Sequence, residues 1–152
     1  MTIKRIILSF IILISSLSAI AGGIGTWKSY LSYANIQWVE QGGNRLYVLA
    51  SNALYTYNKA DQSIQTYDKQ NGLSSIDIRF IGWNEVAKRL VIVYEDNNID
   101  LMDAKGNVTN VPDYYLKALT ADKTVYGIDM NGAYCYLSTG FGLVKLNVAK
   151  AE

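Results

Sequence analysis

Short hydrophobic runs alternate with clusters of turn-forming residues along most of the chain. The runs are rich in β-branched and aromatic residues, which favour strands, and they occupy residues 45–50, 53–57, 63–67 and 89–94. The turn formers Gly, Asn and Asp lie between them, at residues 42–44, 51–52, 58–61, 97–98, 105–107 and 131–132. Asn and Gly adopt the positive φ angles of tight hairpin turns at low cost. Because no window of about 11 residues after the first 21 has a convincing helical period, the pattern predicts an antiparallel β meander.

The strand pattern also repeats, with a period of 44–45 residues. The repeat places residues at corresponding positions in three successive copies, which are Leu46, Leu90 and Cys135 in one strand and Leu54, Ile99 and Leu143 in the next. A period of about 40–45 residues with four short strands is the size of one β-propeller blade, and each blade buries its faces against its neighbours. The sequence therefore predicts an all-β fold, a partial β-propeller of about three four-stranded antiparallel blades. A β-sandwich or barrel with accidental self-similarity is the alternative.

Two tryptophans fit the same repeat. Trp38 and Trp83 are separated by 45 residues. We predict that they occupy matching, mostly buried positions in adjacent blades, where a large side chain fills the space between blades. The single cysteine, Cys135, lies between tyrosines in a strand-like run, so we predict a small buried hydrophobic residue there.

The first 21 residues have the pattern of a signal peptide. Lys4 and Arg5 precede an apolar run that begins at Ile6, and Ala19 and Ala21 form the small-residue pattern that signal peptidase accepts. The alternative is a membrane anchor, but the apolar core of about a dozen residues is shorter than the ~20 that a spanning helix needs. We therefore expect cleavage after Ala21, export of residues 22–152, and no transmembrane segment after cleavage.

The length of the remaining chain limits the architecture. Residues 22–152 hold just under three blades of this period, whereas closed propellers need ~4–8. We therefore expect residues 22–152 to be the N-terminal part of a β-propeller domain, as a fragment of a longer protein or a truncated reading frame.

The composition excludes several kinds of chemistry. The chain has no histidine and one cysteine, which removes Ser-His and Cys-His catalysis, His-ligated metal sites and an internal disulfide. A formal net charge of +1 argues against nucleic-acid binding, which needs a concentrated basic patch. The acidic residues Glu95, Asp96, Asp100 and Asp103 could pair for glycoside hydrolysis, but solvated turn positions explain them better. The segment from Asp96 also lacks the Gly and Glu of a calcium-binding EF-hand loop. We predict no catalytic, metal or cofactor site.

Adjacent tyrosines are the only ligand-contacting candidates that the pattern offers. Tyr114 and Tyr115 interrupt the repeat beside Pro112. Two exposed tyrosines can stack on a sugar ring, so they are weak candidates for ligand binding, and packing within the loop is the alternative.

Three segments resemble known propeller repeats. Residues 67–75, which contain Asn71-Gly72-Leu73-Ser74, resemble the recurrent Asn-Gly-Leu-Ser signature of the two-component-regulator propellers of Bacteroidetes. Residues 140–147 resemble the Gly-Leu-x-x-Leu/Tyr-Asn strand of the same repeats. Residues 25–33, with Trp27-Lys28-Ser29-Tyr30, are similar to the opening of PorZ-type proteins of the type IX secretion attachment complex. The resemblance extends over essentially all of residues 22–152.

The resemblance implies an exported binding and scaffold domain that is not an enzyme. PorZ-type proteins carry two propellers and a C-terminal module, and at the outer surface they cooperate with a sortase-like protease that attaches cargo to lipopolysaccharide. The implied location is the periplasm or the outer-membrane surface. The implied partners are proteins of a surface attachment complex, with lipopolysaccharide or another glycan as a further candidate. The alternative is the periplasmic ligand-sensing propeller of a hybrid two-component regulator that binds glycan fragments.

Overall fold

The computed structural model describes residues 32–152, so the expected signal peptide and the Trp27-Lys28-Ser29-Tyr30 segment lie outside the described residues. Eleven strands and one helical turn follow one another in this part of the chain. The elements are β1 (Ile36–Gly42), β2 (Arg45–Ala50), β3 (Ala53–Asn58), β4 (Ile64–Tyr67), β5 (Ile78–Asn84), β6 (Arg89–Tyr94), β7 (Ile99–Asp103), β8 (Val108–Asn110), α2 (Asp113–Leu116), β9 (Val125–Asn131), β10 (Tyr134–Thr139) and β11 (Gly142–Asn147).

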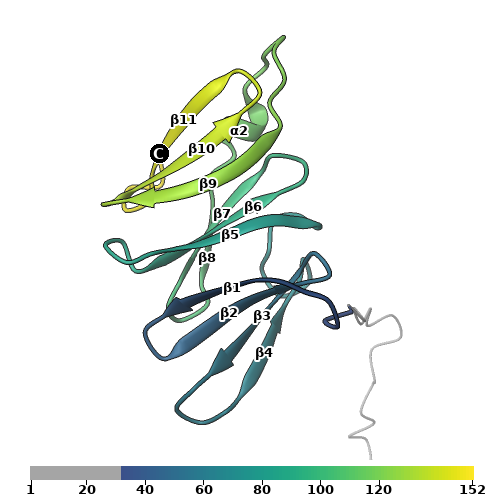
Figure 1. Ribbon diagram of the computed structural model, residues 1–152, viewed down its shortest axis with the longest axis vertical. Coiled ribbons are helices and arrows are strands. Elements are labelled where there is room, and N and C mark those ends of the chain that lie inside the picture. Colours follow the sequence, from purple (N-terminus) through teal and green to yellow (C-terminus); the bar gives the residue numbers. More distant parts are fainter. Residues whose placement is uncertain (1–31) are drawn as a thin grey trace, which may run out of the picture.

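The strands form three antiparallel sheets in sequence order, β1-β2-β3-β4, β5-β6-β7-β8 and β9-β10-β11. Figure 1 shows the sheets stacked one after another, with β1, β5 and β9 along one side of the stack. This arrangement confirms the predicted all-β, partial β-propeller fold. The third sheet has three strands instead of the expected four. The residues after β11 turn back, and Asn147 N–H donates to the carbonyl of Glu152.

The hairpin turns explain why the strands are so short. Ser51 and Asn52 connect β2 to β3 with φ angles of 48° and 60°, and two successive positive φ angles match the twist of a two-residue hairpin. The turn between β9 and β10 contains Gly132 with a φ of 60°. These two turns each reverse the chain within two residues, and the next strand pairs directly with the previous one.

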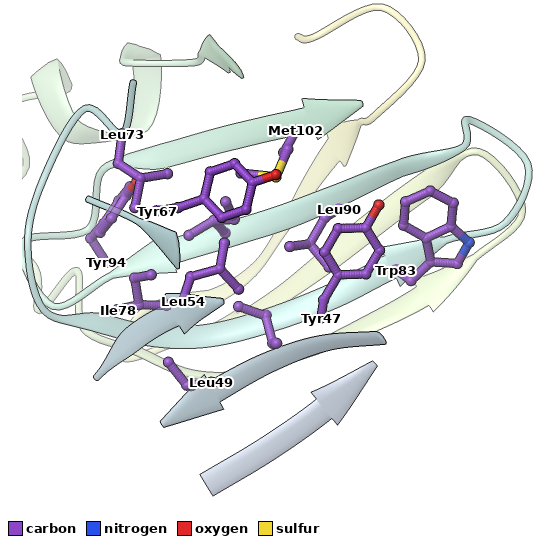
Figure 2. Packing of buried hydrophobic residues seen from close by; sticks show 12 residues of the cluster. Tyr47, Leu49, Leu54, Tyr67, Leu73, Ile78, Trp83, Leu90, Tyr94 and Met102 are labelled. Carbon is purple, nitrogen blue, oxygen red and sulfur yellow. The ribbon is translucent and has the colours of Figure 1, made fainter. Parts of the chain in front are cut away.

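Each sheet buries its side chains against the next sheet, which gives two core layers. The strand β6 alternates between them, because Leu90 and Ile92 belong to the layer against the first sheet while Val91 and Val93 belong to the layer against the third. All four side chains are fully buried. The strongly apolar run of residues 89–94 therefore forms a strand with two buried faces. Figure 2 shows the layer between the first two sheets.

The two tryptophans do not occupy matching positions, and Trp38 is not mostly buried. Trp83 is 9% exposed and stacks on Tyr47, with ring centroids 5.3 Å apart and an interplanar angle of 18°; Figure 2 shows the two rings side by side. Trp38 is 57% exposed. Trp38 pairs with Leu49, and the corresponding residue of the second sheet is Phe80, which pairs with Val93.

The reason for the mismatch is the length of the first hairpin turn. Two residues separate the paired Gly42 and Arg45, whereas four separate the paired Asn84 and Arg89. The spacing between corresponding residues is therefore 44 in the second strands and 42 in the first strands, from Gly42 to Asn84. A shift of three residues also moves a side chain to the other face of a strand.

The other repeat positions lie at equivalent places in the sheets. Leu46, Leu90 and Cys135 each follow the first residue of the second strand, and they pair with Gln41, Trp83 and Met130. The residues Leu54, Ile99 and Leu143 pair with Leu49, Val93 and Ser138. Leu54 and Ile99 are buried, whereas Leu143 is 66% exposed. Cys135 is fully buried, and burial raises the pKa of its thiol to about 12.

Candidate ligand-binding groove on the inner strands

The first strands of the three sheets line a groove, which we call the inner groove. The strand β1 contacts β5, and β5 contacts β9. The groove has a volume of about 620 Å³ and is lined by Trp38 and Glu40 of β1, residues 79–83 of β5 and residues 127–130 of β9. Because β1, β5 and β9 are edge strands of their sheets, their outer sides carry backbone N–H and C=O groups that no neighbouring strand of the same sheet pairs. One of these groups, the Trp83 N–H, donates to Glu40 Oε2 at 3.4 Å.

Glycine positions set the shape of the groove floor. A Cβ atom at Gly82 would lie 2.7 Å from Met130 Cε and 3.0 Å from Ile128 Cδ1. The side chains of β9 therefore pack directly over the backbone of β5. Gly127 has no such neighbour, because no heavy atom lies within 4 Å of a Cβ built there. The floor is thus apolar and closely packed at Gly82 and open at Gly127.

One exposed aromatic ring stands at the wall of the groove. The indole Nε1–H of Trp38 donates to Glu40 Oε1 at 2.7 Å. The only polar atom of the ring therefore has a hydrogen-bond partner that fixes the orientation of the indole, while 57% of the residue surface stays exposed. An indole held in this way offers its flat face for stacking or for contact with a cation.

The charged residues that line the groove are Glu40, Arg79 and Asp129. Arg79 is neutralised by Glu95 through a salt bridge of 2.9 Å, and its guanidinium lies 5.7 Å from the centre of the Phe80 ring. The carboxylate of Asp129 is exposed and has no hydrogen bond or ion pair to any residue of the described range 32–152. Asp129 pairs with Tyr136, on the face of β9 opposite Ile128 and Met130, so its side chain points away from the second sheet. Glu40 therefore supplies the uncompensated negative charge beside Trp38.

Tyr114 and Tyr115 lie in α2, outside the inner groove, and the structure separates them. Tyr114 packs partly buried against the second core layer, and its hydroxyl donates to the carbonyl of Lys123 at 2.5 Å. Burial raises the pKa of this phenol. Tyr115 is 48% exposed. Adjacent residues of a helical turn point about 100° apart, so the two rings do not form one stacking surface.

The acidic residues of the second sheet do not converge on one point. Glu95 pairs with Arg79, Asp96 accepts the hydroxyl of Ser75 at 2.5 Å, and Asp103 accepts the N–H of Lys105 at 2.8 Å. Among the residues that the structure describes, no group of three or more His, Cys, Asp or Glu side chains is placed to hold a metal ion.

Asp100 differs from the solvated turn position that the sequence suggested, because it is fully buried. Its carboxylate accepts hydrogen bonds from the Tyr94 hydroxyl at 2.6 Å, from the Ser74 N–H at 2.8 Å and from Asn110 Nδ2 at 2.8 Å. Burial, and then the bond to Asp100, raise the pKa of Tyr94 well above its usual range. The one available signal was the position of Asp100 inside an apolar strand, between Ile99 and Leu101.

The Asn-Gly-Leu-Ser segment connects the first sheet to the second. Gly72 has a φ of 123°, which favours glycine, and Leu73 is 6% exposed in the core layer between the sheets. The next residue, Ser74, donates its N–H to the buried Asp100. The signature therefore has a structural role, since it turns the chain and attaches the connection to the second blade.

Three stacked antiparallel sheets with their first strands along a common groove define part of a β-propeller. The family model of the type IX secretion protein PorZ, N-terminal β-propeller domain, matches residues 46–152, and the chain belongs to this family. No helix among residues 32–152 has the length and apolar character needed to cross a membrane.

Two solved structures are similar to the chain. PorZ of Porphyromonas gingivalis, described as an essential bacterial surface component of the type IX secretion system, is 33% identical with a TM-score of 0.77. The extracellular domain of BT4673, a candidate one component system of B. thetaiotaomicron, is 14% identical with a TM-score of 0.61, and this likeness shows the fold alone. Each match covers 84% of this chain and 17% of the other chain. No curated protein matches.

Proposed function

We propose that residues 22–152 are the N-terminal part of the propeller of an exported, PorZ-like surface component of a type IX secretion system. In this role the domain binds and positions partner proteins of a surface attachment complex and is not a catalyst. The observation that carries the proposal is the family match over residues 46–152, together with 33% identity to PorZ of P. gingivalis.

The geometry supports a binding role. The described acidic residues of the second sheet are engaged in turns, a salt bridge and a buried hydrogen-bond network. The inner groove offers an exposed indole, charged groups and unpaired strand edges. These features suit recognition of a partner, and lipopolysaccharide or another glycan stays a further candidate ligand.

The proposal includes the route to the surface. The leader of residues 1–21 has a basic start, an apolar core and a small-residue cleavage pattern. We infer that it directs export and is removed after Ala21, which places the mature chain in the periplasm or at the outer-membrane surface.

An in-frame deletion of residues 46–152 in the source bacterium tests this function. We expect type IX cargo to lose its attachment to the cell surface, and a complementing intact gene to restore the attachment. The intact protein should also be cleaved when protease is added to whole cells. Normal cargo attachment after the deletion would contradict the scaffold role, and an accompanying loss of a transcriptional response to glycans would favour the sensor alternative.

A further inference from the structure

We propose that the inner groove binds an extended basic peptide of a partner protein, with a Lys or Arg side chain over the ring of Trp38 and with Glu40 as its counter-charge. The inference deepens the binding role proposed above and rests on it. It names the chemistry of the partner segment and the residues that recognise it.

The exposed indole is the first reason. Trp38 is 57% exposed, yet its Nε1–H is already bonded to Glu40. A ligand therefore meets the ring face and not the polar edge. Tryptophan is the aromatic residue that attracts cations best, and a carboxylate that accepts the indole N–H makes the ring more electron-rich.

Charge complementarity is the second reason. Within the described residues, Arg79 is the one cation that lines the groove, and Glu95 already pairs with it. The carboxylate of Glu40 accepts N–H groups from Trp38 and Trp83 and has no cationic partner in residues 32–152. A cationic side chain is attracted to this site, whereas an acidic ligand is repelled.

The strand edges indicate a peptide and not a free cation. The three strands that line the groove are edge strands, and unpaired edge groups bind extended peptides through main-chain hydrogen bonds. The volume of about 620 Å³ lies within the usual range of binding pockets, roughly 300–1,000 Å³. The apolar floor, which includes Ile81 and Met130, accommodates the aliphatic stem of a Lys or Arg side chain.

Fluorescence anisotropy with the whole chain and a labelled Gly-Lys-Gly-Lys-Gly peptide tests the proposal. We expect saturable binding that is absent for the matching Gly-Glu-Gly-Glu-Gly peptide. Loss of the cation–aromatic contact in Trp38→Ala should weaken binding about two- to fivefold, with Trp38→Phe in between. Binding should also weaken when salt shortens the Debye length from about 10 Å to about 3 Å.

Matched charge variants separate a specific site from general attraction. Glu40→Gln should weaken peptide binding, whereas Asp61→Asn, in the turn between the outer strands β3 and β4, and Asp129→Asn, on the face of β9 turned away from the second sheet, should not. Thermal unfolding of each variant verifies that it is folded. The proposal would be overturned if Asp61→Asn weakened binding equally, or if the glutamate peptide also bound. It would also be overturned if maltotriose displaced the lysine peptide, or if no saturable binding occurred at millimolar peptide. None of these outcomes changes the result of the cargo-attachment experiment. Failure of the peptide proposal can therefore be distinguished from failure of the proposed scaffold function.

Discussion

Gly42 allows the Trp83 ring to lie against the backbone of β1. A Cβ atom at this position would be 2.6 Å from two ring carbons of Trp83. Trp83 is also stacked on Tyr47, so the ring cannot move away freely. We expect Gly42→Ala to lower the free energy of unfolding by about 1–3 kcal/mol, the usual cost of overpacking. Urea-induced unfolding measures this difference.

Gly127 provides the matched control, because it lies in the corresponding first strand of the third sheet and no heavy atom lies within 4 Å of its added Cβ. Gly127→Ala should change the free energy of unfolding by no more than about 0.5 kcal/mol. Equal losses in both variants would show that backbone effects dominate and that the Trp83 packing is described wrongly.

Tyr94 makes stability depend on alkaline pH. The pKa of its phenol in the folded state is raised far above the ordinary 10.0, first by burial and then by Asp100. The unfolded chain therefore loses this proton first as pH rises above about 10, and the free energy of unfolding falls. Comparison of urea unfolding at about pH 8 and about pH 11 should show a smaller loss in Tyr94→Phe than in the natural chain. An identical loss would mean that Tyr94 keeps an ordinary pKa.

At the scale of the elements, Asp100 attaches the connection that precedes β5 to strand β7. Asp100→Asn keeps the shape of the side chain but replaces one of its two oxygens with an N–H₂ group. Tyr94 and Ser74 donate to one oxygen and Asn110 donates to the other, so at least one donor loses its acceptor. We expect a loss of about 2–3 kcal/mol in the free energy of unfolding, since bonds to a buried charged group are lost. Faster hydrogen exchange at the Ser74 amide should accompany it.

The same substitution at the exposed Asp129 is the control. Asp129→Asn should leave the free energy of unfolding within about 0.5 kcal/mol of the natural value. If Asp100→Asn also leaves the free energy of unfolding within about 0.5 kcal/mol of the natural value, then the buried carboxylate contributes little to the packing of the first blade against the second.

The second and third strands of each blade were predictable, whereas the register of the first strand was not. Leu46 and Leu90 are each the second residue of their strand, and β2 and β6 begin 44 residues apart. The register of β5 depends on a turn that is two residues longer in the second blade. Both tryptophans donate to a glutamate two residues later, Glu40 and Glu85, at 2.7 Å. Because both tryptophans are followed by a glutamate two residues later, they look equivalent in sequence, although they pair with different positions of the second strands.

The inner groove was harder to predict than the strands. Trp38, Arg79 and Asp129 come from three different blades, so their sequence separations form no motif. Tyr114 and Tyr115 were visible because they interrupt the repeat, but a break in a repeat does not show which side chain is exposed. In the structure Tyr114 packs inward and Tyr115 faces solvent.

At the scale of the whole molecule, the two outermost sheet faces carry apolar side chains without a neighbour in residues 32–152. Ile64 and Val39, on the face of the first sheet opposite its core layer, are 65% and 49% exposed. Leu143, on the corresponding outer face of the third sheet, is 66% exposed. Ile99, the residue of the second sheet that corresponds to Leu143, is buried in the second core layer. The end faces therefore have the chemistry of a blade interface.

Light scattering of residues 22–152 tests most directly whether the chain is an arc of propeller blades with open ends. We expect the protein to self-associate or aggregate, because exposed apolar patches above a few hundred Å² favour association. The double variant Ile64→Lys and Leu143→Lys should remain folded and become monomeric, since it places a charge on each open face. A well-dispersed monomer of the natural sequence with a cooperative thermal transition, or equal association of the double variant, would contradict this account.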